Sequence, residues 1–147
     1  MASPEVNGFF GAKGPVGAIP AAYIYIAKQF YRLTGKYKQQ ERIMLQEYSR
    51  DKWTFHVKGL WYYLRNDTLP SMTIVGSANF GYRSVYRDLE CQCAIVTNNI
   101  QLKQQLREEH MRLYQLSSPV STETFLRRDR HVPLWVRLVT PLIKHFF

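Results

Sequence analysis

The stretch that decides the fold reads Trp53-Thr54-Phe55-His56-Val57-Lys58-Gly59-Leu60-Trp61. Side chains on a β-strand alternate between its two faces, so His56 and Lys58 are expected to share one face. Phe55 and Val57 are expected on the opposite face, where they can pack inward. We therefore predict a strand that presents one titratable imidazole beside one fixed positive charge.

A second strand is expected at Met72-Thr73-Ile74-Val75, and it leads directly into Gly76-Ser77-Ala78-Asn79. Glycine lets a backbone approach a ligand closely, Ser77 and Asn79 supply hydrogen-bond donors, and exposed backbone amides can hold an anion. These features suit a phosphoryl oxygen. Lys58 and Asn79 would bind its charge, and His56 would move a proton or form a bond to phosphorus.

Each part of this pattern also has an ordinary structural interpretation. A single histidine on a strand is more often a hydrogen-bonded structural residue than a catalytic one. A Gly-Ser-x-Asn run is usually a turn. The combination in order, His-x-Lys, then Gly-Ser-x-Asn, then the acid Glu90, favours a phosphoryl-transfer site.

The two motifs together resemble the second half-site of the phospholipase D superfamily, whose signature is His-x-Lys, then Asp, then Gly-Ser-x-Asn. The chain further resembles, over essentially its whole length, the eukaryotic mitochondrial phosphatidylglycerophosphate synthases of that superfamily. The segments that carry this second resemblance are Ala2–Glu5, Gly8–Gly14, Phe55–Trp61, Asn79–Ser84, Arg87–Glu90 and Val139–Lys144.

The resemblance implies an α/β fold, a phospholipase D-like mixed sheet flanked by helices that forms one half-domain. This half-domain is expected over residues 1–131, with its half-site motif in residues 53–90. Residues 132–147 would form an amphipathic tail. The chain is expected to be the C-terminal part of a longer enzyme.

The family reaction transfers a phosphatidyl group from CDP-diacylglycerol to glycerol-3-phosphate and releases CMP. As the resemblance implies, one histidine forms a phosphohistidine while the other gives and then takes a proton. His56 would be this second, acid/base residue, and Lys58 would hold the phosphate. The resemblance implies no cofactor and no metal ion, and the sequence shows no cluster of metal ligands.

The resemblance also assigns supporting roles around the phosphate. Asn79 would hold it together with Lys58, and Ser77 and Arg83 would assist. Glu90 would orient a catalytic histidine through its Nδ1 atom. An ion pair between Glu90 and a nearby arginine, Arg83 or Arg87, is the alternative.

Two features depart from the family pattern. The superfamily acid is expected five residues after Lys58, where this chain has Tyr63, and Asp67 follows in an expected turn. The role of Asp67 is therefore left open.

The chain also has a single His-x-Lys, because none of the other three histidines is followed by lysine two residues later (His110, His131 and His145). An N-terminal half-site or a second copy of this chain must supply the other, so the isolated chain is expected to be inactive or weakly active as a homodimer.

Composition is consistent with a folded domain that binds anions. The chain has 147 residues, 46% of them hydrophobic, and a formal net charge of +9. That charge favours anionic partners such as a membrane surface, but no run of five or six basic residues occurs, so nucleic acid is not an expected partner.

Cys91 and Cys93, two apart on one expected strand face, are poorly placed to bridge and are interpreted as small core residues in a reducing compartment. No secretory signal opens the sequence. By resemblance the protein would lie at the periphery of the mitochondrial inner membrane, with its targeting segment upstream.

Periodicity predicts the remaining elements. Helices are expected at residues 21–33, ended by Gly35, and at residues 98–116, with Asn98 as cap and Leu102, Leu106, Leu113 and a structural His110 on one face. Short strands are expected at residues 43–45 and 89–97, the latter well covered. The glycine-rich segment with Lys13 is either a phosphate-binding loop or a plain surface loop.

The tail from Val132 to Phe147 is rich in Leu, Trp and Phe. If it is helical, Arg137, Thr140 and Lys144 form a narrow polar stripe. Sixteen residues with two prolines and two cations are too short and too polar to cross a bilayer. The tail either lies in the membrane interface or packs on the domain's own core.

Three other functions fit the same residues. A phosphatidylserine or cardiolipin synthase would use the same half-site with another alcohol, and a phosphodiesterase or nuclease would use water. A non-catalytic membrane-binding half is the third, since one half-site cannot supply both nucleophile and acid.

Overall fold

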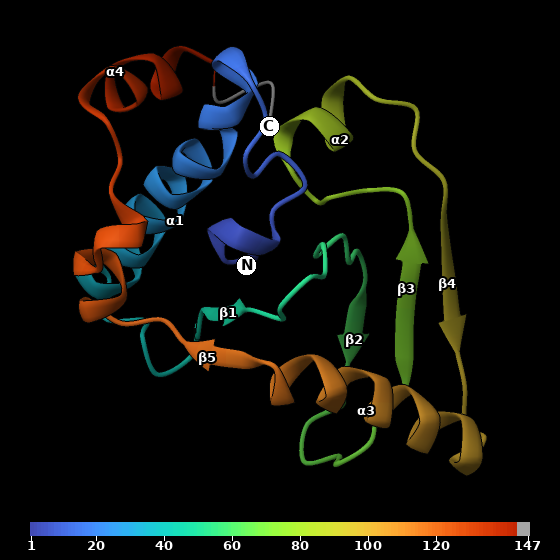
Figure 1. Cartoon of the computed structure of the whole chain (residues 1–147). Helices are drawn as coiled ribbons and strands as arrows, with labels where there is room; N and C mark the ends of the chain where they lie inside the picture. Colours follow the sequence, from blue (N-terminus) through green and yellow to red (C-terminus); the bar gives the residue numbers. More distant parts are fainter. Residues whose placement is uncertain (144–147) are drawn as a thin grey trace. The chain divides into compact units, whose positions relative to one another are not determined.

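The computed structural model of the chain describes residues 1–143 (Figure 1). These residues form two compact units. The first contains residues 1–56 together with residues 116–143, and the second contains residues 57–115. His56 is therefore the last residue of one segment of the first unit, and Val57 begins the second unit.

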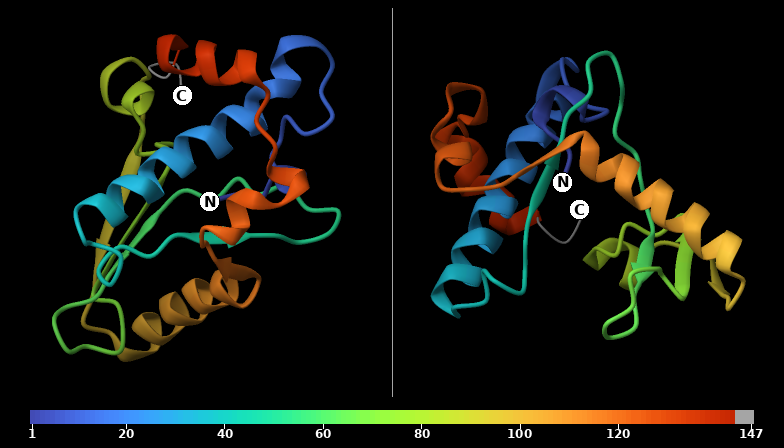
Figure 2. Two further views of the ribbon diagram at one scale, coloured as in Figure 1. Left: turned by 90° about the vertical axis from the view of Figure 1, so that its left-hand side faces the viewer. Right: turned by 90° about the horizontal axis from the view of Figure 1, so that it is seen from below.

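The first unit is mainly helical. Its long helix α1 (Ile19–Lys36) follows two short 3-10 helices, η1 (Pro4–Val6) and η2 (Gly14–Ala18). Strand β1 (Gln46–Tyr48) pairs antiparallel with β5 (Ser117–Pro119). The chain continues through η3 (Glu123–Leu126) and η4 (Arg128–Arg130) into α4 (Leu134–Ile143). Figure 2 shows α4 and the preceding turns lying along α1.

Helix α1 begins with Pro20 in its first turn, where a missing N–H costs no hydrogen bond. It continues past the expected stop at Gly35 to Lys36, because a single glycine weakens a helix without breaking it. The residues it buries include Ala22, Ile24 and Thr34. Phe30 and Leu33 on the same helix are 44% and 49% exposed.

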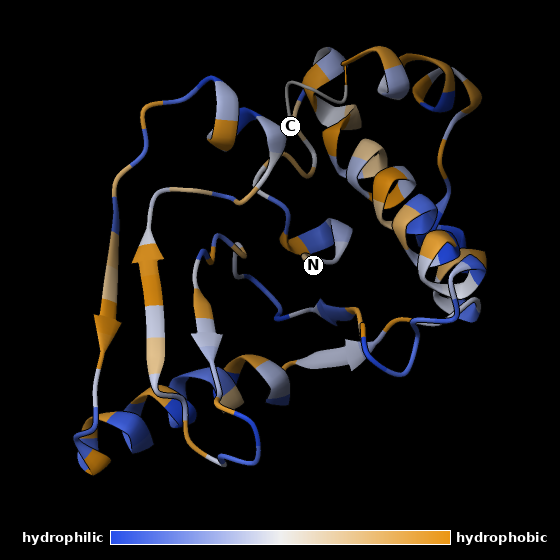
Figure 3. Ribbon diagram, turned by 180° about the vertical axis from the view of Figure 1, so that it is seen from behind, coloured by the Kyte–Doolittle hydropathy of each residue, from blue (hydrophilic) through white to orange (hydrophobic). Residues whose placement is uncertain are grey.

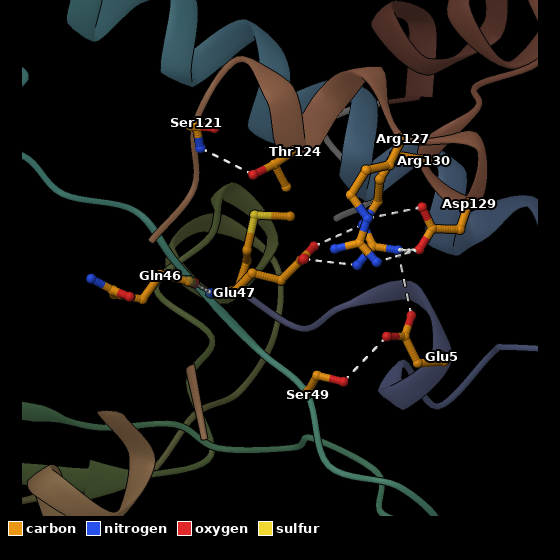
Figure 4. Close-up of polar contacts among 10 residues, drawn as sticks. Glu5, Gln46, Glu47, Ser49, Ser121, Thr124, Arg127, Asp129 and Arg130 are labelled. Carbon is orange, nitrogen blue, oxygen red and sulfur yellow. Dashed lines mark hydrogen bonds and ion pairs between the residues drawn. The ribbon is translucent and has the colours of Figure 1, made fainter. Parts of the chain in front are cut away.

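The centre of the first unit holds a charged residue, Arg130, which is only 3% exposed. Its guanidinium forms two parallel hydrogen bonds to the carboxylate of Glu47, from Nε at 3.0 Å and from Nη2 at 2.7 Å (Figure 4). Its Nη1 lies 2.7 Å from Asp129 and 3.5 Å from Glu5. Burial alone would lower the pKa of Arg130, but hydrogen bonding and attraction from Glu47 raise it above its ordinary value. This network joins β1, η1 and η4.

The expected strand at residues 43–45 lies slightly later, at β1. Glu47 and Tyr48 of β1 are buried, whereas Met44 is 71% exposed. The apolar residues 43–45 therefore lie just before the strand and not in it. The strand itself is fixed by pairing with β5 and by the Glu47–Arg130 contact.

The second unit contains a three-stranded antiparallel sheet in the order β2-β3-β4. The strands are β2 (Leu60–Tyr62), β3 (Met72–Gly76) and β4 (Gln92–Val96). They are followed along the chain by helix α3 (Ile100–Gln115), and a short helix α2 (Tyr82–Tyr86) lies between β3 and β4. Leu60 pairs with Ile74, and Ile74 pairs with Ala94. Thr73, 1% exposed, anchors β3 to β2 by donating from its hydroxyl to the Leu60 carbonyl at 3.0 Å.

The α/β fold class is confirmed, and both sheets are built from antiparallel pairs. A single isolated parallel bridge, between Ala2 and Tyr48, is the parallel component among the residues described. The sheets are thus less mixed than the resemblance suggested.

Strand β4 is not covered as its sequence predicted. All five of its residues are exposed, and Cys91 and Cys93 are free, exposed cysteines rather than core residues. Figure 3 shows hydrophobic residues on β3 and β4. A hydrophobic strand sequence predicts that the strand is buried on both faces. It does not show that the residues which bury it belong to this chain.

Helix α3 is capped one residue later than predicted. The Asn99 side chain, rather than that of Asn98, accepts a hydrogen bond from the Leu102 N–H at 2.9 Å. Leu102, Leu106 and His110 are half-buried on one face of the helix, as expected. The imidazole of His110 stacks on Trp61 with a ring separation of 5.3 Å, which confirms its structural role.

Helix α4 buries Val136 and Thr140, while Leu134, Leu138 and Leu142 are exposed. The predicted polar stripe is thus partly an inward contact: the Thr140 hydroxyl donates to the Val136 carbonyl at 2.6 Å. Lys144 lies outside the described residues. Within residues 1–143, no helix has the length and apolar character that crossing a membrane requires.

Candidate active half-site

The His56-Val57-Lys58 segment is extended but belongs to no strand. Residues 53–59 have no assigned secondary structure, and strand β2 begins at Leu60. Phe55 anchors the segment by donating its backbone N–H to the Val6 carbonyl at 2.8 Å and by packing its ring 4.5 Å from that of Tyr48. His56 is exposed and Lys58 is half-buried. Val57, expected to face inward, is 44% exposed.

Gly59 directly follows this motif and needs to be glycine. Its φ is 156°, and a Cβ atom at this position would lie 3.1 Å from the Ile74 carbonyl oxygen. A residue without a side chain therefore lets the backbone after Lys58 pass close to β3. This contact sets where the His-x-Lys segment enters the sheet.

Ser77 and Glu90, predicted site residues thirteen positions apart, are in direct contact. The Ser77 hydroxyl donates to the Glu90 carboxylate and accepts a hydrogen bond from the Cys91 N–H at 3.1 Å. The Ser77 N–H donates in turn to the Cys91 carbonyl at 3.1 Å. Glu90 is half-buried. The loop after β3 and the segment before β4 are thus joined at the predicted anion-binding position.

Gly76 makes this contact possible because β3 and β4 come very close there. A Cβ atom on Gly76 would lie 2.8 Å from the Cα of Gln92 and still closer to the carbonyl oxygen of Cys91. Both neighbours are backbone atoms, which cannot rotate away as a flexible side chain can.

We predict that Gly76→Ala lowers the free energy of unfolding by about 1–3 kcal/mol, the usual cost of overpacking. Gly8→Ala is the matched control, because its added Cβ would meet only the Thr54 side chain at 3.6 Å. Urea unfolding of both variants measures the difference. Equal midpoints for the two variants would contradict the close approach at Gly76.

Asn79 lies at the turn between β3 and α2. Its backbone N–H donates to the Ser84 hydroxyl at 3.1 Å, and Phe80 follows with a left-handed φ of 57°. A non-glycine residue in this region is strained, and such strain collects at functional loops. Ser84 was not singled out from the sequence. Ser84 lies in the first turn of α2, where a serine hydroxyl can accept from a backbone N–H of the preceding loop.

Arg83 pairs with Asp88 through its Nε at 2.9 Å, and both residues lie near the surface. Glu90 is held by Ser77, so the structure brings together Ser77 with Glu90 and Arg83 with Asp88. An exposed ion pair of this kind contributes little to stability. The Arg83 side chain is 57% exposed.

The departure from the superfamily acid is also explained. The Tyr63 hydroxyl lies 2.9 Å from Nδ1 of His110, and burial raises the pKa of the Tyr63 phenol. Asp67 lies 3.8 Å from the Lys103 ammonium on α3. Both residues therefore make structural contacts with α3.

Burial lowers the pKa of His110 below its ordinary value of 6.5, so the folded protein favours the neutral ring. Its neighbours are Trp61, Tyr63 and Tyr114. The unfolded chain then binds more protons between the folded pKa and the ordinary value, so stability falls as pH decreases through that window. We predict that His110→Phe removes the part of the pH dependence of stability that comes from this histidine. Urea midpoints of both proteins at pH 7.5 and pH 5 measure it, and an identical pH dependence in both would contradict it.

Within residues 1–143, no three His, Cys, Asp or Glu side chains gather in an arrangement that could hold a metal ion. Near Ser77 the hydroxyl and backbone N–H groups are the kinds of donor that bind an oxyanion, whereas the Glu90 carboxylate accepts hydrogen bonds and holds the Ser77 hydroxyl.

Known proteins are similar in sequence to this chain. No family model matches the chain. Over 147 residues, all of this chain, it is 63% identical to the mitochondrial CDP-diacylglycerol–glycerol-3-phosphate 3-phosphatidyltransferase of Gallus gallus and 60% identical to that of Homo sapiens. The predicted family resemblance is confirmed. The corresponding protein of Saccharomyces cerevisiae is 33% identical over 154 residues, which cover 97% of this chain and 30% of the yeast protein.

The chain spans 26% of the length of the Gallus gallus and Homo sapiens relatives. Among solved structures, the phosphatidylserine synthase of Haemophilus influenzae matches 99% of this chain and 34% of its own, with a TM-score of 0.75 and 18% identity. At that identity the likeness shows a shared fold. It supports the predicted phospholipase D-like architecture.

Proposed function

We propose that this chain supplies the second His-x-Lys half-site of a phosphatidyltransferase. The enzyme would make phosphatidylglycerophosphate from CDP-diacylglycerol and glycerol-3-phosphate and release CMP. The 63% identity to the Gallus gallus phosphatidyltransferase over the whole chain carries this proposal. The contact between Ser77 and Glu90 supports it, because it joins two predicted site residues.

The proposed chemistry proceeds in two steps. A histidine from the other half-site attacks the phosphatidyl phosphorus, the bond from phosphorus to CMP breaks, and His56 gives a proton to the departing CMP oxygen. The hydroxyl of glycerol-3-phosphate then attacks the phosphohistidine while His56 takes its proton, and the phosphorus–nitrogen bond breaks. Lys58 and Asn79 stabilise the negative charge on the phosphoryl oxygens at both steps.

Supporting residues position the phosphate. The Ser77 hydroxyl donates to Glu90 and so fixes the phosphate-binding loop, and the Arg83 guanidinium would bind phosphate oxygens. Glu90 would orient a catalytic imidazole through its Nδ1 atom. Its contact with Ser77 ties the same carboxylate to the phosphate-binding loop.

The other half-site would come from an N-terminal part of the enzyme or from a second copy of this chain. Exposed hydrophobic residues on the second unit fit such a partner. Val96 is 76% exposed, Leu89 is fully exposed and Val75 is 40% exposed. The relatives are named mitochondrial. We propose that this protein lies at the periphery of the mitochondrial inner membrane, on an anionic membrane surface.

A chimera tests the proposal. In it, this chain replaces the matched residues of the Gallus gallus relative, and CMP release from CDP-diacylglycerol in vesicles is measured with glycerol-3-phosphate, with L-serine, and with neither. CMP release that requires glycerol-3-phosphate is the expected result. Release that requires serine would indicate a different acceptor, and equal release without an alcohol would indicate a hydrolase.

A further inference from the structure

An open pocket of about 580 Å³ lies in the first unit, between α1, the η3–η4 segment and α4. Its walls combine hydrophobic side chains with six Lys and Arg residues, and no Asp or Glu is among its lining residues in the part of the chain described. The six cations are Lys28, Arg32, Arg127, Arg128, Arg130 and Arg137.

Two of these cations are already neutralised. Arg130 is bound by Glu47, and Arg127 pairs with Asp129 at 2.7 Å. Because these two arginines are paired with carboxylates, they contribute mainly to the shape of the pocket and little to its positive charge.

The other four cations have no ion pair within residues 1–143: Lys28, Arg32, Arg128 and Arg137. Arg137 donates from Nε to the Val132 carbonyl at 2.9 Å, which fixes the side chain and leaves the rest of its planar donor set for a ligand. Four uncompensated positive charges around one concave site concentrate a positive potential. Arginine forks match the oxygens of a phosphate group.

A second, independent feature adjoins this pocket. Helix α4 contributes Arg137 to the pocket, and its outward face is hydrophobic. On a helix, Leu134 and Leu138, four residues apart, lie on the side away from the buried Thr140, and Leu134 is also a neighbour of Arg137. Leu134 is 70% and Leu138 67% exposed, and the face extends to Trp135 and Leu142, which are 52% and 78% exposed. A helix with a hydrophobic face, a tryptophan and a flanking cation is typical of helices that lie in a membrane interface.

We propose that this pocket binds the phosphate headgroup of an acidic phospholipid while the outward face of α4 lies among the adjoining acyl chains. The pocket supplies charge complementarity, and α4 supplies the hydrophobic surface that a soluble phosphate would not need. The site is built from the first unit, whereas Ser77 and Glu90 belong to the second. It therefore binds lipid whether or not the chain takes part in phosphatidyl transfer.

The test is co-sedimentation of the chain with phosphatidylcholine vesicles, with and without a fixed fraction of phosphatidic acid. Arg32→Ala/Arg128→Ala removes two exposed pocket cations and is expected to weaken binding to the phosphatidic acid vesicles about tenfold or more. The control Arg65→Ala/Arg112→Ala removes the same charge from exposed positions of the second unit and is expected to weaken binding far less. Equal losses in the two double variants would overturn the pocket as the binding site.

Two further arms separate a lipid from a free phosphate. Leu138→Gln is expected to weaken vesicle binding severalfold, and brominated acyl chains are expected to quench Trp135 fluorescence, with Trp135→Phe as control. Unchanged binding by Leu138→Gln, or no quenching assignable to Trp135, would contradict insertion of α4. Inorganic phosphate at the concentration of lipid phosphate is expected to compete poorly, and full displacement by it would show a site for free phosphate instead.

Discussion

His56→Ala is expected to lower CMP release by the chimera about 10²–10⁴-fold, the usual contribution of a positioned acid/base residue. The imidazole gives a proton to the departing CMP oxygen and later takes one from the attacking hydroxyl, and alanine does neither. His56 is exposed and lies outside the helices and strands, so its removal should leave the fold intact. The rate of CMP release with saturating CDP-diacylglycerol and glycerol-3-phosphate measures the effect.

A charge-matched pair separates the half-site from general electrostatics. Lys58→Ala, which removes the cation beside His56, is expected to be strongly impaired as well. Arg65→Ala removes the same charge from an exposed turn of the second unit and is expected to keep the parent rate. A His56→Ala chimera that releases CMP at the parent rate would show that the histidine is structural, as a single histidine on an extended segment often is.

Arg130→Ala is expected to lower the free energy of unfolding by about 3–5 kcal/mol, because it leaves the carboxylate of Glu47 buried without its partner. Glu47 is 6% exposed and receives two hydrogen bonds from Arg130. Taking an unpaired charge out of water is costly, whereas the intact pair satisfies both groups. Urea unfolding measures the loss.

Two variants test this explanation. Arg130→Met/Glu47→Leu removes both charges and is expected to recover most of the loss, because hydrophobic groups can replace a buried ion pair. Arg127→Ala breaks only the exposed pair with Asp129 and is expected to change stability by less than about 1 kcal/mol. A double variant as unstable as Arg130→Ala would mean that the arginine stabilises the unit by packing rather than by compensating Glu47.

The sequence predicted what local chemistry determines. Strand β3, the long helices α1 and α3, and the packed role of His110 all followed from periodicity and flanking residues. The cap of α3 was one residue off, because Asn98 and Asn99 have the same side chain and only the geometry of the helix end selects Asn99.

What it could not predict depends on contacts between distant residues. The His56 segment has strand-like alternation, yet within residues 1–143 it is assigned to no strand. Cys93 lies in a hydrophobic stretch that is typical of a buried strand, yet both Cys93 and the rest of β4 are exposed. The Arg130–Glu47 pair joins residues 83 positions apart, and no periodicity records such a contact.

The candidate site shows the same division. Motif order selected Ser77 and Glu90, and the structure joins them. The basic pocket beside α4 was not predicted, because Arg32 and Arg137 are 105 positions apart in the chain (137 minus 32) and meet only once α4 lies along α1. Arg128 could be predicted from sequence only as an exposed charge.

The central claim is that this chain is one of two half-sites, and mixing the halves tests it most directly. CMP release from CDP-diacylglycerol with glycerol-3-phosphate would be measured for the 147-residue chain alone, and after adding the remainder of the Gallus gallus relative as a separate protein. Sedimentation would report the oligomeric state in both samples. We predict that the monomeric chain releases no CMP and that release appears on mixing. A chain that sediments as a monomer and releases CMP at a substantial rate by itself would contradict the account.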